Sequence, residues 1–232
     1  MVGKSLSLCI TTWQRDRMTA NSFAKVLKDD RITEIVIVDD ASDDMIWRRL
    51  QQQCNHPKVK LFRNQKNKGC YFNKQQAVKE STSEWVIIFD SDNTMTKEYI
   101  DALFSVEWEV NKIYAPEFAS PVFDYRHFSG QVITKQNAGS FIGKKMFDCM
   151  INTCNYFVNK EEYLRIFDSS IEPWTADTIY QNYNWLKAGN SIQVLKGMHY
   201  DHLIHDQSHY KKYVHKTGNL FRDLELKIKM LK

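Results

Sequence analysis

Apolar runs and segments of helical spacing alternate four times through the first 106 residues. The apolar runs are short, nearly continuous and rich in β-branched residues, which is typical of strands covered on both faces of a parallel sheet. We therefore predict an α/β fold with a mainly parallel sheet flanked by helices. The predicted strands are 6–12, 34–38, 59–62 and 85–89, and the predicted helices are 19–27, 44–54, 73–80 and 96–106.

The rhythm changes past residue 110. Residues 118–139 mix aromatic and polar side chains with turn signals, which indicates smaller antiparallel strands or long loops. Helical spacing returns at 160–166 and 175–188, and a last strand is predicted at 191–195. No internal repeat and no low-complexity linker divides the sequence, so we expect one composite domain rather than two.

Composition narrows the class of protein. With 232 residues, 43% of them hydrophobic, the chain is long enough to bury a substantial core. A net charge of +4 tolerates a phosphorylated ligand without demanding nucleic acid. Five cysteines without a Cys-x-x-Cys pair favour thiols in a reducing compartment over disulfides or a zinc site. No secretory signal or membrane span is evident, so a cytoplasmic location is expected.

Two carboxylates follow the fourth predicted strand. Asp90 and Asp92, separated by Ser91, come directly after the apolar run 85–89. In open α/β sheets, ligands bind at the carboxyl ends of the strands. Two carboxylates at this edge suit a hard divalent cation shared with a phosphate. The same three residues are also typical of a capped turn at the end of a strand, but their position after the fourth strand favours a metal site.

The end of the first predicted strand carries a second candidate group. Thr11, Thr12, Trp13 and Arg15 combine hydroxyls, an aromatic face and a cation. This combination suits a ligand made of a base and a phosphate, with Trp13 stacked on the base. The alternative is that Trp13 is a core residue beneath a loop.

Further candidate carboxylates follow the second strand and open a later helix. Asp39, next to Asp40, can accept a hydrogen bond from a ribose hydroxyl or a base N–H, although the same run is also typical of a helix cap. Asp177 is a candidate general base, with Glu172 as a nearby competitor. A capping role at the helix N-terminus would also explain Asp177.

Four of the seven histidines lie between residues 199 and 209. Imidazole is a common metal ligand. The spacing of His199, His202 and His205 matches no compact zinc motif, so we expect at most one of them to bind metal.

Together these segments resemble the family 2 glycosyltransferases of the GT-A fold. The resemblance extends in order over residues 5–210, and its end is similar to the bacterial spore-coat-type and polysaccharide glycosyltransferases. The matching segments are 9–15, 37–42, 67–69, 89–93, 176–177 and 200–208.

The resemblance implies one catalytic domain over residues 1–210. Its first half, 1–110, would bind a nucleotide sugar, and 111–210 would supply the acceptor and catalytic side. A basic amphipathic helix or tail would follow at 211–232. The implied donor-binding residues are Thr11, Thr12, Trp13, Arg15, Asp39, Asn67, Lys68, Asp90, Ser91 and Asp92.

The same resemblance implies a metal site and a base. Asp92 would hold Mn²⁺ or Mg²⁺ with Asp90 close by, and His205 would be a late metal or phosphate contact. Asp177 aligns with the catalytic base of the family. One departure is Asn-Lys-Gln at 73–75, where many members carry Ala-Arg-Asn; another is an alanine before the base, where many carry glutamate.

The expected reaction is an inverting, metal-dependent transfer from a nucleotide sugar, with a UDP-sugar as the family-level expectation, to a hydroxyl of a glycan or glycoconjugate acceptor. A nucleotidyltransferase is disfavoured because residues 11–18 contain no glycine. A receiver-type signalling domain and a catalytically inactive nucleotide-sugar-binding relative are further alternatives.

The tail could contact an anionic membrane peripherally, but packing on the domain is favoured because most apolar helix faces join a core.

Overall fold

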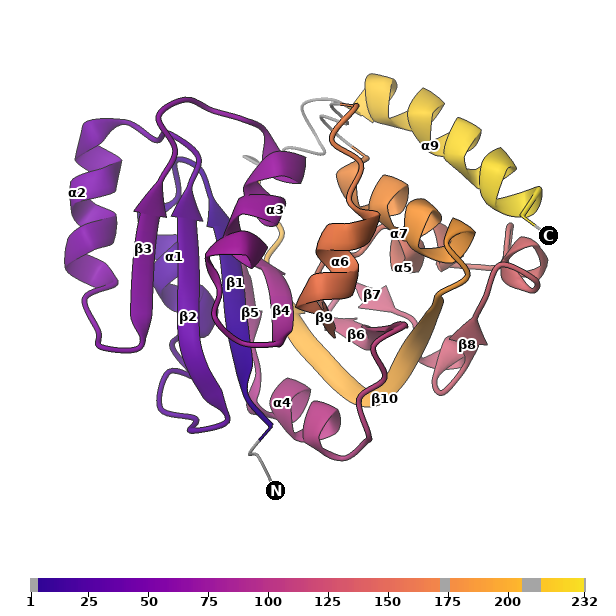
Figure 1. Cartoon of the computed structure of the whole chain (residues 1–232), viewed down its shortest axis with the longest axis horizontal. Coiled ribbons are helices and arrows are strands. Elements are labelled where there is room, and N and C mark those ends of the chain that lie inside the picture. Colours follow the sequence, from indigo (N-terminus) through magenta and orange to yellow (C-terminus); the bar gives the residue numbers. More distant parts are fainter. Residues whose placement is uncertain (1–3, 172–175, 206–213, 232) are drawn as a thin grey trace.

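The computed structural model of the protein describes residues 4–171, 176–205 and 214–231 (Figure 1). A mixed sheet crosses the molecule, and helices cover both of its faces. Its strands follow the order β3-β2-β1-β4-β9-β6-β10-β5, with β7 beside β6 and β8 beside β10. The strand bounds are β1 Leu6–Thr12, β2 Ile32–Asp39, β3 Val59–Arg63, β4 Trp85–Asp90, β5 Asn93–Met95, β6 Lys112–Ser120, β7 Phe123–Asp124, β8 Val132–Ile133, β9 Tyr156–Asn159 and β10 Ser191–His202.

The first half of the sheet is parallel, as predicted, through β3, β2, β1 and β4. Every residue of β1 is buried, because the two faces of the sheet lie in two separate apolar cores. Leu8 and Ile10 point into the core beneath α1, α2 and α4, whereas Cys9 points into the core beneath α3. The helix bounds are α1 Asp16–Phe23, α2 Asp44–Gln53, α3 Cys70–Glu80 and α4 Lys97–Phe104.

The first helix differs from its prediction. It begins at Asp16 rather than at residue 19 and ends at Phe23, and turns follow it. Val26 is buried from these turns, so its apolar side chain joins the core without belonging to a helix. Apolar spacing alone does not show whether a buried residue such as Val26 belongs to a helix or to a turn.

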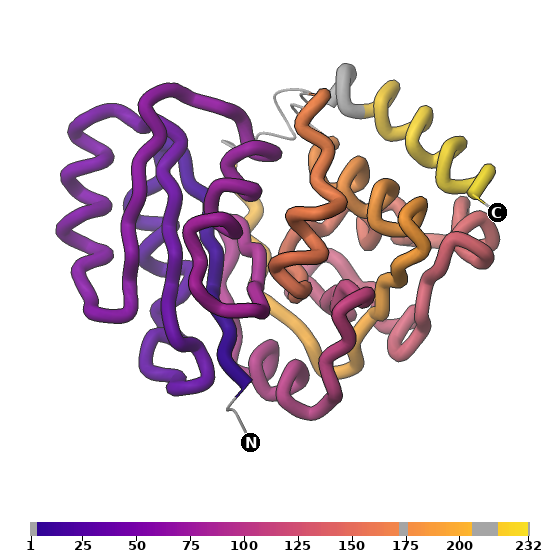
Figure 2. The backbone as a smooth tube through the Cα atoms, viewed as in Figure 1, coloured from indigo at the N-terminus to yellow at the C-terminus, as the bar shows by residue number. Residues whose placement is uncertain are grey.

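The second half of the sheet is mixed. β9 pairs antiparallel with β4 and β6, whereas β6 and β10 run parallel. Small antiparallel strands were predicted for 118–139, and β7 and β8 are such strands, each two residues long. Figure 2 shows the two halves of the chain side by side, with the earlier half on the left. The helices here are η1 Arg126–Phe128, η2 Ala138–Ser140, α5 Phe147–Ile151, α6 Lys160–Ile166 and α7 Asp177–Lys187.

The last strand is longer than its prediction of 191–195. β10 continues to His202, and its register against β6 shifts between Leu195 and His199. Gly197 lies in this irregularity with φ +81°, a conformation that favours glycine. This irregularity hides the continuation of the strand in the sequence. β10 runs in the same direction as β1 and β4, so its end lies at the same edge of the sheet.

The C-terminal helix packs on the domain. Leu224 and Ile228 of α9 (Val214–Lys229) are buried in the core that also contains α7. Gly139 of η2 allows this close approach, since a Cβ there would lie 3.2 Å from the carbonyl oxygen of Lys229. The packing alternative for this segment is therefore confirmed. In the part of the chain that the structure describes, no helix is both long and apolar enough to span a bilayer.

Because of buried Glu34, the free energy of unfolding is expected to depend on pH in the acid range. Burial alone would raise its pKa, but hydrogen bonds from Lys60, Ser7 and Thr82 outweigh burial and lower the pKa from 4.5 to about 2. The folded state therefore binds this proton more weakly than the unfolded chain does. We expect the resulting stabilisation to be complete above pH 4.5 and to disappear toward pH 2, a loss of about 3 kcal/mol.

Chemical unfolding between pH 6 and pH 2.5 would measure this contribution. In Glu34→Gln, the free energy of unfolding should fall less steeply between pH 4.5 and pH 2.5 than in the wild-type protein. Glu107 has an exposed side chain, so Glu107→Gln should leave this acid dependence unchanged. An acid limb of equal steepness in Glu34→Gln and the wild-type protein would contradict the assignment.

Candidate active site

A cavity of about 1030 Å³ opens at the carboxyl ends of β1 and β4. The ends of these strands, the start of α3, the start of α7, the end of β10 and one side of α9 all contribute to its walls. It thus gathers chemistry-bearing residues from across the sequence. Those of the predicted site that line it are Thr11, Thr12, Trp13, Arg15, Asn67, Asp90, Asp92, Asp177 and His205.

The turn after β1 places Trp13 at the cavity with 41% of its surface exposed. The alternative that Trp13 is a core residue is therefore wrong. Gln14 adopts a left-handed conformation with φ 56°, and its backbone N–H donates to Ser42 Oγ at 2.7 Å. Thr12 Oγ1 lies 2.7 Å from Thr19 Oγ1, which ties the strand end to α1. The turn is thus held rigidly enough to present an aromatic face.

The two aspartates after β2 have structural partners. Asp39 is fully buried, accepts hydrogen bonds from the backbone N–H and hydroxyl of Ser42, and lies 3.5 Å from Arg63 Nε. Burial raises the pKa of Asp39. It does not line the cavity, so its position does not support the predicted contact with a nucleobase. The aspartate that reaches the cavity is Asp40.

Asp40 organises the loop that precedes α3. Its carboxylate accepts hydrogen bonds from Asn64 Nδ2 at 2.8 Å and from the backbone N–H groups of Lys68 and Gly69, each at 2.9 Å. Asn67 Oδ1 accepts a second bond from Gly69 N at 3.0 Å. The Asn-Lys-Gly segment of the sequence is therefore a loop that Asp40 shapes.

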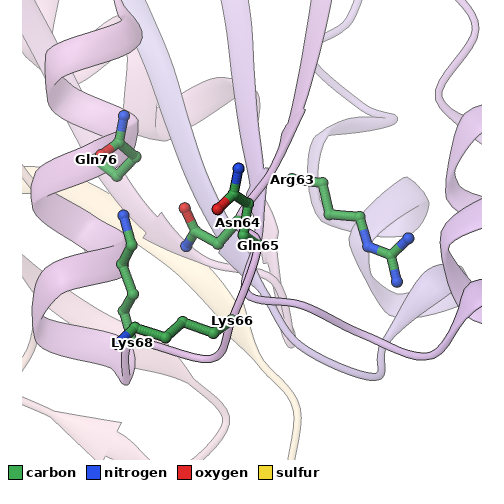
Figure 3. Close-up of a pocket in the computed structure, with 6 residues that line it drawn as sticks. All are labelled: Arg63, Asn64, Gln65, Lys66, Lys68 and Gln76. Atoms are coloured by element: carbon green, nitrogen blue, oxygen red, sulfur yellow. The ribbon is translucent and has the colours of Figure 1, made fainter.

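The side chain of Lys68 turns away from the large cavity. It lines a smaller, basic pocket of about 520 Å³ (Figure 3). The predicted contact between the Lys68 side chain and a donor in the large cavity therefore has no support from its position. The pocket is lined by Arg63, Asn64, Gln65, Lys66, Lys68 and Gln76.

The Asp-Ser-Asp motif ends β4 with its two carboxylates in different environments. Asp92 Oδ2 lies 2.7 Å from Arg15 Nη1 and 3.0 Å from His205 Nε2. Asp90 instead accepts from Cys154 Sγ at 2.7 Å. Ser91 is fully buried, and its hydroxyl has no hydrogen-bond partner among the described residues. Of the three, only Asp90 and Asp92 line the cavity.

Lys74 connects the motif to Asp177. Its Nζ lies 2.6 Å from Asp177 Oδ2 and 3.5 Å from Asp90 Oδ1. Burial lowers the pKa of Lys74, but the charges of Asp177 and Asp90 outweigh burial and raise it well above its ordinary value. Sequence reasoning noticed Lys74 only as a departure from the family pattern. A cation at the position where many members carry arginine was the signal available.

The late histidines have different surroundings. Of the three late histidines that the structure describes, His205 contacts Asp92. The ring of His202 contacts Phe123 edge-on at a centroid distance of 4.9 Å. Its Nδ1 is buried with no hydrogen-bond partner among the described residues, and burial lowers the pKa of His202. His199 interacts with the carbonyl of Gly197 and does not line the cavity. His209 lies outside the described residues, as do Glu172, Thr175 and the segment 206–208.

The end of the cavity near Asp92 and His205 offers suitable ligands for a divalent cation. Among the described residues, no group of three or more His, Cys, Asp or Glu is already arranged around a metal position. Asp92 and His205 are nevertheless in contact. Asn93 lines the same cavity, and its buried Oδ1 has no hydrogen-bond partner within the part of the chain that the structure describes. The carboxylate and amide oxygens suit Mn²⁺ or Mg²⁺, and imidazole is in general a common metal ligand. The residues therefore fit such an ion.

The far wall of the cavity comes from α5 and α9. Asp148 and Cys149 line it from α5, and Phe221, Arg222 and Glu225 line it from α9. Burial and the charge of Asp148 raise the pKa of Glu225. Nothing in the sequence connected this helix with the site, because a tail with an apolar face can pack on many surfaces.

Solved structures share this fold at low sequence identity. The crystal structure of S. aureus TarS residues 1–349 has a TM-score of 0.64 and 16% identity over 84% of this chain. The Pyrobaculum calidifontis mannosyltransferase PcManGT has a TM-score of 0.70 and 13% identity over 97%. GalNAc-T7 has a TM-score of 0.66 and 13% identity over 94%. The chain has the GT-A fold of these glycosyltransferases.

The chain spans 59% of that TarS chain, 69% of PcManGT and 50% of GalNAc-T7. No curated protein matches it in sequence. Residues 7–106 match the model of glycosyl transferase family 2, and these residues contain the predicted nucleotide-binding strands and the Asp-Ser-Asp motif. Over residues 7–106 the chain is thus similar to glycosyl transferase family 2, and as a whole it has the GT-A fold.

Proposed function

We propose that this glycosyltransferase is inverting and metal-dependent, and that it transfers a sugar from a nucleotide donor to a hydroxyl of a glycan or other acceptor. The observation that carries the proposal is the meeting of Asp92, Lys74 and Asp177 in one cavity. The structure of PcManGT is a complex with GDP-Man and Mn²⁺, that of GalNAc-T7 contains UDP, GalNAc and Mn²⁺, and one structure of TarS 1–349 is a complex with UDP-GlcNAc. These ligands support a nucleotide-sugar donor, and we propose a UDP-sugar.

The donor would lie between the β1 turn and the motif after β4. Trp13 offers its exposed face to the base, and stacking of this kind contributes about 1–3 kcal/mol. Asp92, Asn93 and His205 would hold Mn²⁺ or Mg²⁺, with Asp90 at the edge of the same site. When bound there, the cation supplies positive charge that stabilises the leaving diphosphate.

Asp177 would act as the base. It is the first residue of α7, so its carboxyl group lies at the positive end of the helix dipole. Lys74 holds one of its oxygens at 2.6 Å and so fixes its orientation. In the proposed step, Asp177 takes the proton of the acceptor hydroxyl, and that oxygen bonds to the anomeric carbon. The bond from this carbon to the diphosphate oxygen breaks on the opposite face, which inverts the configuration.

Nucleotide binding is the first test of this proposal. Thermal unfolding would be measured with UDP, GDP, ADP, CDP and dTDP, each with and without Mn²⁺. One diphosphate should raise the melting temperature in an Mn²⁺-dependent manner, and the corresponding nucleotide sugars should then release that diphosphate in the presence of glycan acceptors. Release of pyrophosphate would instead indicate a nucleotidyltransferase. Binding without any turnover would favour an inactive relative, and the absence of binding would contradict the proposal.

A further inference from the structure

One oxygen of Asp92 is shared by two donors. Arg15 Nη1 lies 2.7 Å and His205 Nε2 lies 3.0 Å from the same Oδ2 atom. The three side chains are only 18%, 11% and 17% exposed for Arg15, His205 and Asp92. Water screens such a pair weakly, so the charge of the guanidinium is strongly felt at the carboxylate.

The backbone of Arg15 is held in place at the start of α1. The carbonyl of Arg15 accepts from Thr19 N at 3.1 Å at the start of α1. The residue before it, Gln14, is tied to Ser42 at 2.7 Å. Because this backbone is anchored, the guanidinium of Arg15 remains near the Asp92 end of the cavity even when it is not paired with Asp92.

We propose that Arg15 is an exchangeable counter-ion that links metal binding to diphosphate binding. This inference rests on the proposed function, in which Asp92 holds the cation. Without a donor, Arg15 neutralises Asp92. A divalent cation on the same carboxylate repels the guanidinium and displaces it. The diphosphate of the donor then offers Arg15 a new partner, whose oxygens match its planar pair of N–H groups.

Arg15 should therefore have opposite effects on two ligands. It competes with a divalent cation that binds alone, because the two positive charges share one carboxylate. It favours the diphosphate, because it supplies positive charge to the phosphate oxygens. The cation and the nucleotide consequently strengthen each other's binding, and this coupling must be reciprocal. A residue that only stabilised the turn could not change the two affinities in opposite directions.

The test uses the full chain with Arg15→Ala, Arg15→Lys and the matched control Arg17→Ala. Arg17 is exposed, lies one position past the start of α1 and does not line the cavity. Binding of Mn²⁺ alone would be followed by the EPR signal of free Mn²⁺. Binding of UDP and GDP at saturating Mn²⁺ would be followed by calorimetry, and thermal unfolding would confirm that each variant is folded.

Arg15→Ala should bind Mn²⁺ alone about three- to tenfold more tightly than the wild-type protein, the range expected from removing a partly buried ion pair. The same variant should bind the preferred diphosphate about tenfold more weakly. Arg15→Lys should keep the affinity for Mn²⁺ near that of the wild type but weaken diphosphate binding, because an ammonium lacks the planar pair of donors. Arg17→Ala should change neither affinity.

Mn²⁺ affinity that is unchanged or weaker in Arg15→Ala would overturn the counter-ion role while leaving the proposed function intact. Absence of Mn²⁺ binding in both the wild-type protein and Arg15→Ala would overturn the metal site itself, and with it this inference. The two failures are therefore distinguishable.

Discussion

Replacing Asp177 with asparagine is expected to lower kcat for sugar transfer by about 10²–10⁴-fold. Asparagine has nearly the same shape but cannot accept the proton of the acceptor hydroxyl. Donor binding should change little, because Asp177 belongs to α7 rather than to the strand ends that would hold the nucleotide. Steady-state kinetics with the nucleotide sugar identified by the binding test, together with calorimetric donor affinity, would measure both effects.

The matched control for this change is Asp30→Asn, which makes the same chemical substitution at a fully exposed side chain. Because Asp177→Asn also leaves buried Lys74 without its closest carboxylate, thermal unfolding must show that the variant is folded. Near-normal turnover in a folded Asp177→Asn variant would contradict the assignment of Asp177 as the base.

Asp92→Asn should weaken Mn²⁺-dependent binding of the preferred nucleoside diphosphate by about 100-fold or more, since a metal ligand and its charge are lost together. Binding measured without Mn²⁺ should change far less. Calorimetry at fixed nucleotide with increasing Mn²⁺ would separate the two. Asp124→Asn, an exposed aspartate paired with Arg126, is the control. Equal Mn²⁺ dependence in Asp92→Asn and the wild-type protein would contradict the metal assignment.

The parallel half of the fold was predictable because its strands are buried on both faces. Continuous apolar runs of this kind leave few alternatives, and the strands β1, β2, β3 and β4 begin and end within about two residues of their predictions. Helix ends were less certain, as α1 shows, because a buried apolar residue such as Val26 can belong to a turn. The mixed half was harder still. A register shift near Gly197 divides β10, and no local pattern spans that break.

The site was predictable where chemistry and strand ends coincide. Asp90, Asp92 and Trp13 follow apolar strands, and all three line the cavity. Asp39 met the same criterion but is fully buried and bonded to Ser42. Asp39 and Asp40 are adjacent and cannot be told apart from the sequence around them. Only the path of the turn decides that Asp40 is the one of the two that lines the cavity.

By itself, the sequence determined the α/β class, the positions of the first four strands and the carboxylates at their ends, because backbone burial and residue chemistry are local properties of the chain. Only the tertiary structure decided which charges meet. Lys74 reaches Asp177 across 103 positions, and Arg15 and His205 converge on Asp92 from opposite ends of the chain. Such pairs depend on how helices dock on the sheet. That docking results from packing summed over the whole core, which no local pattern encodes.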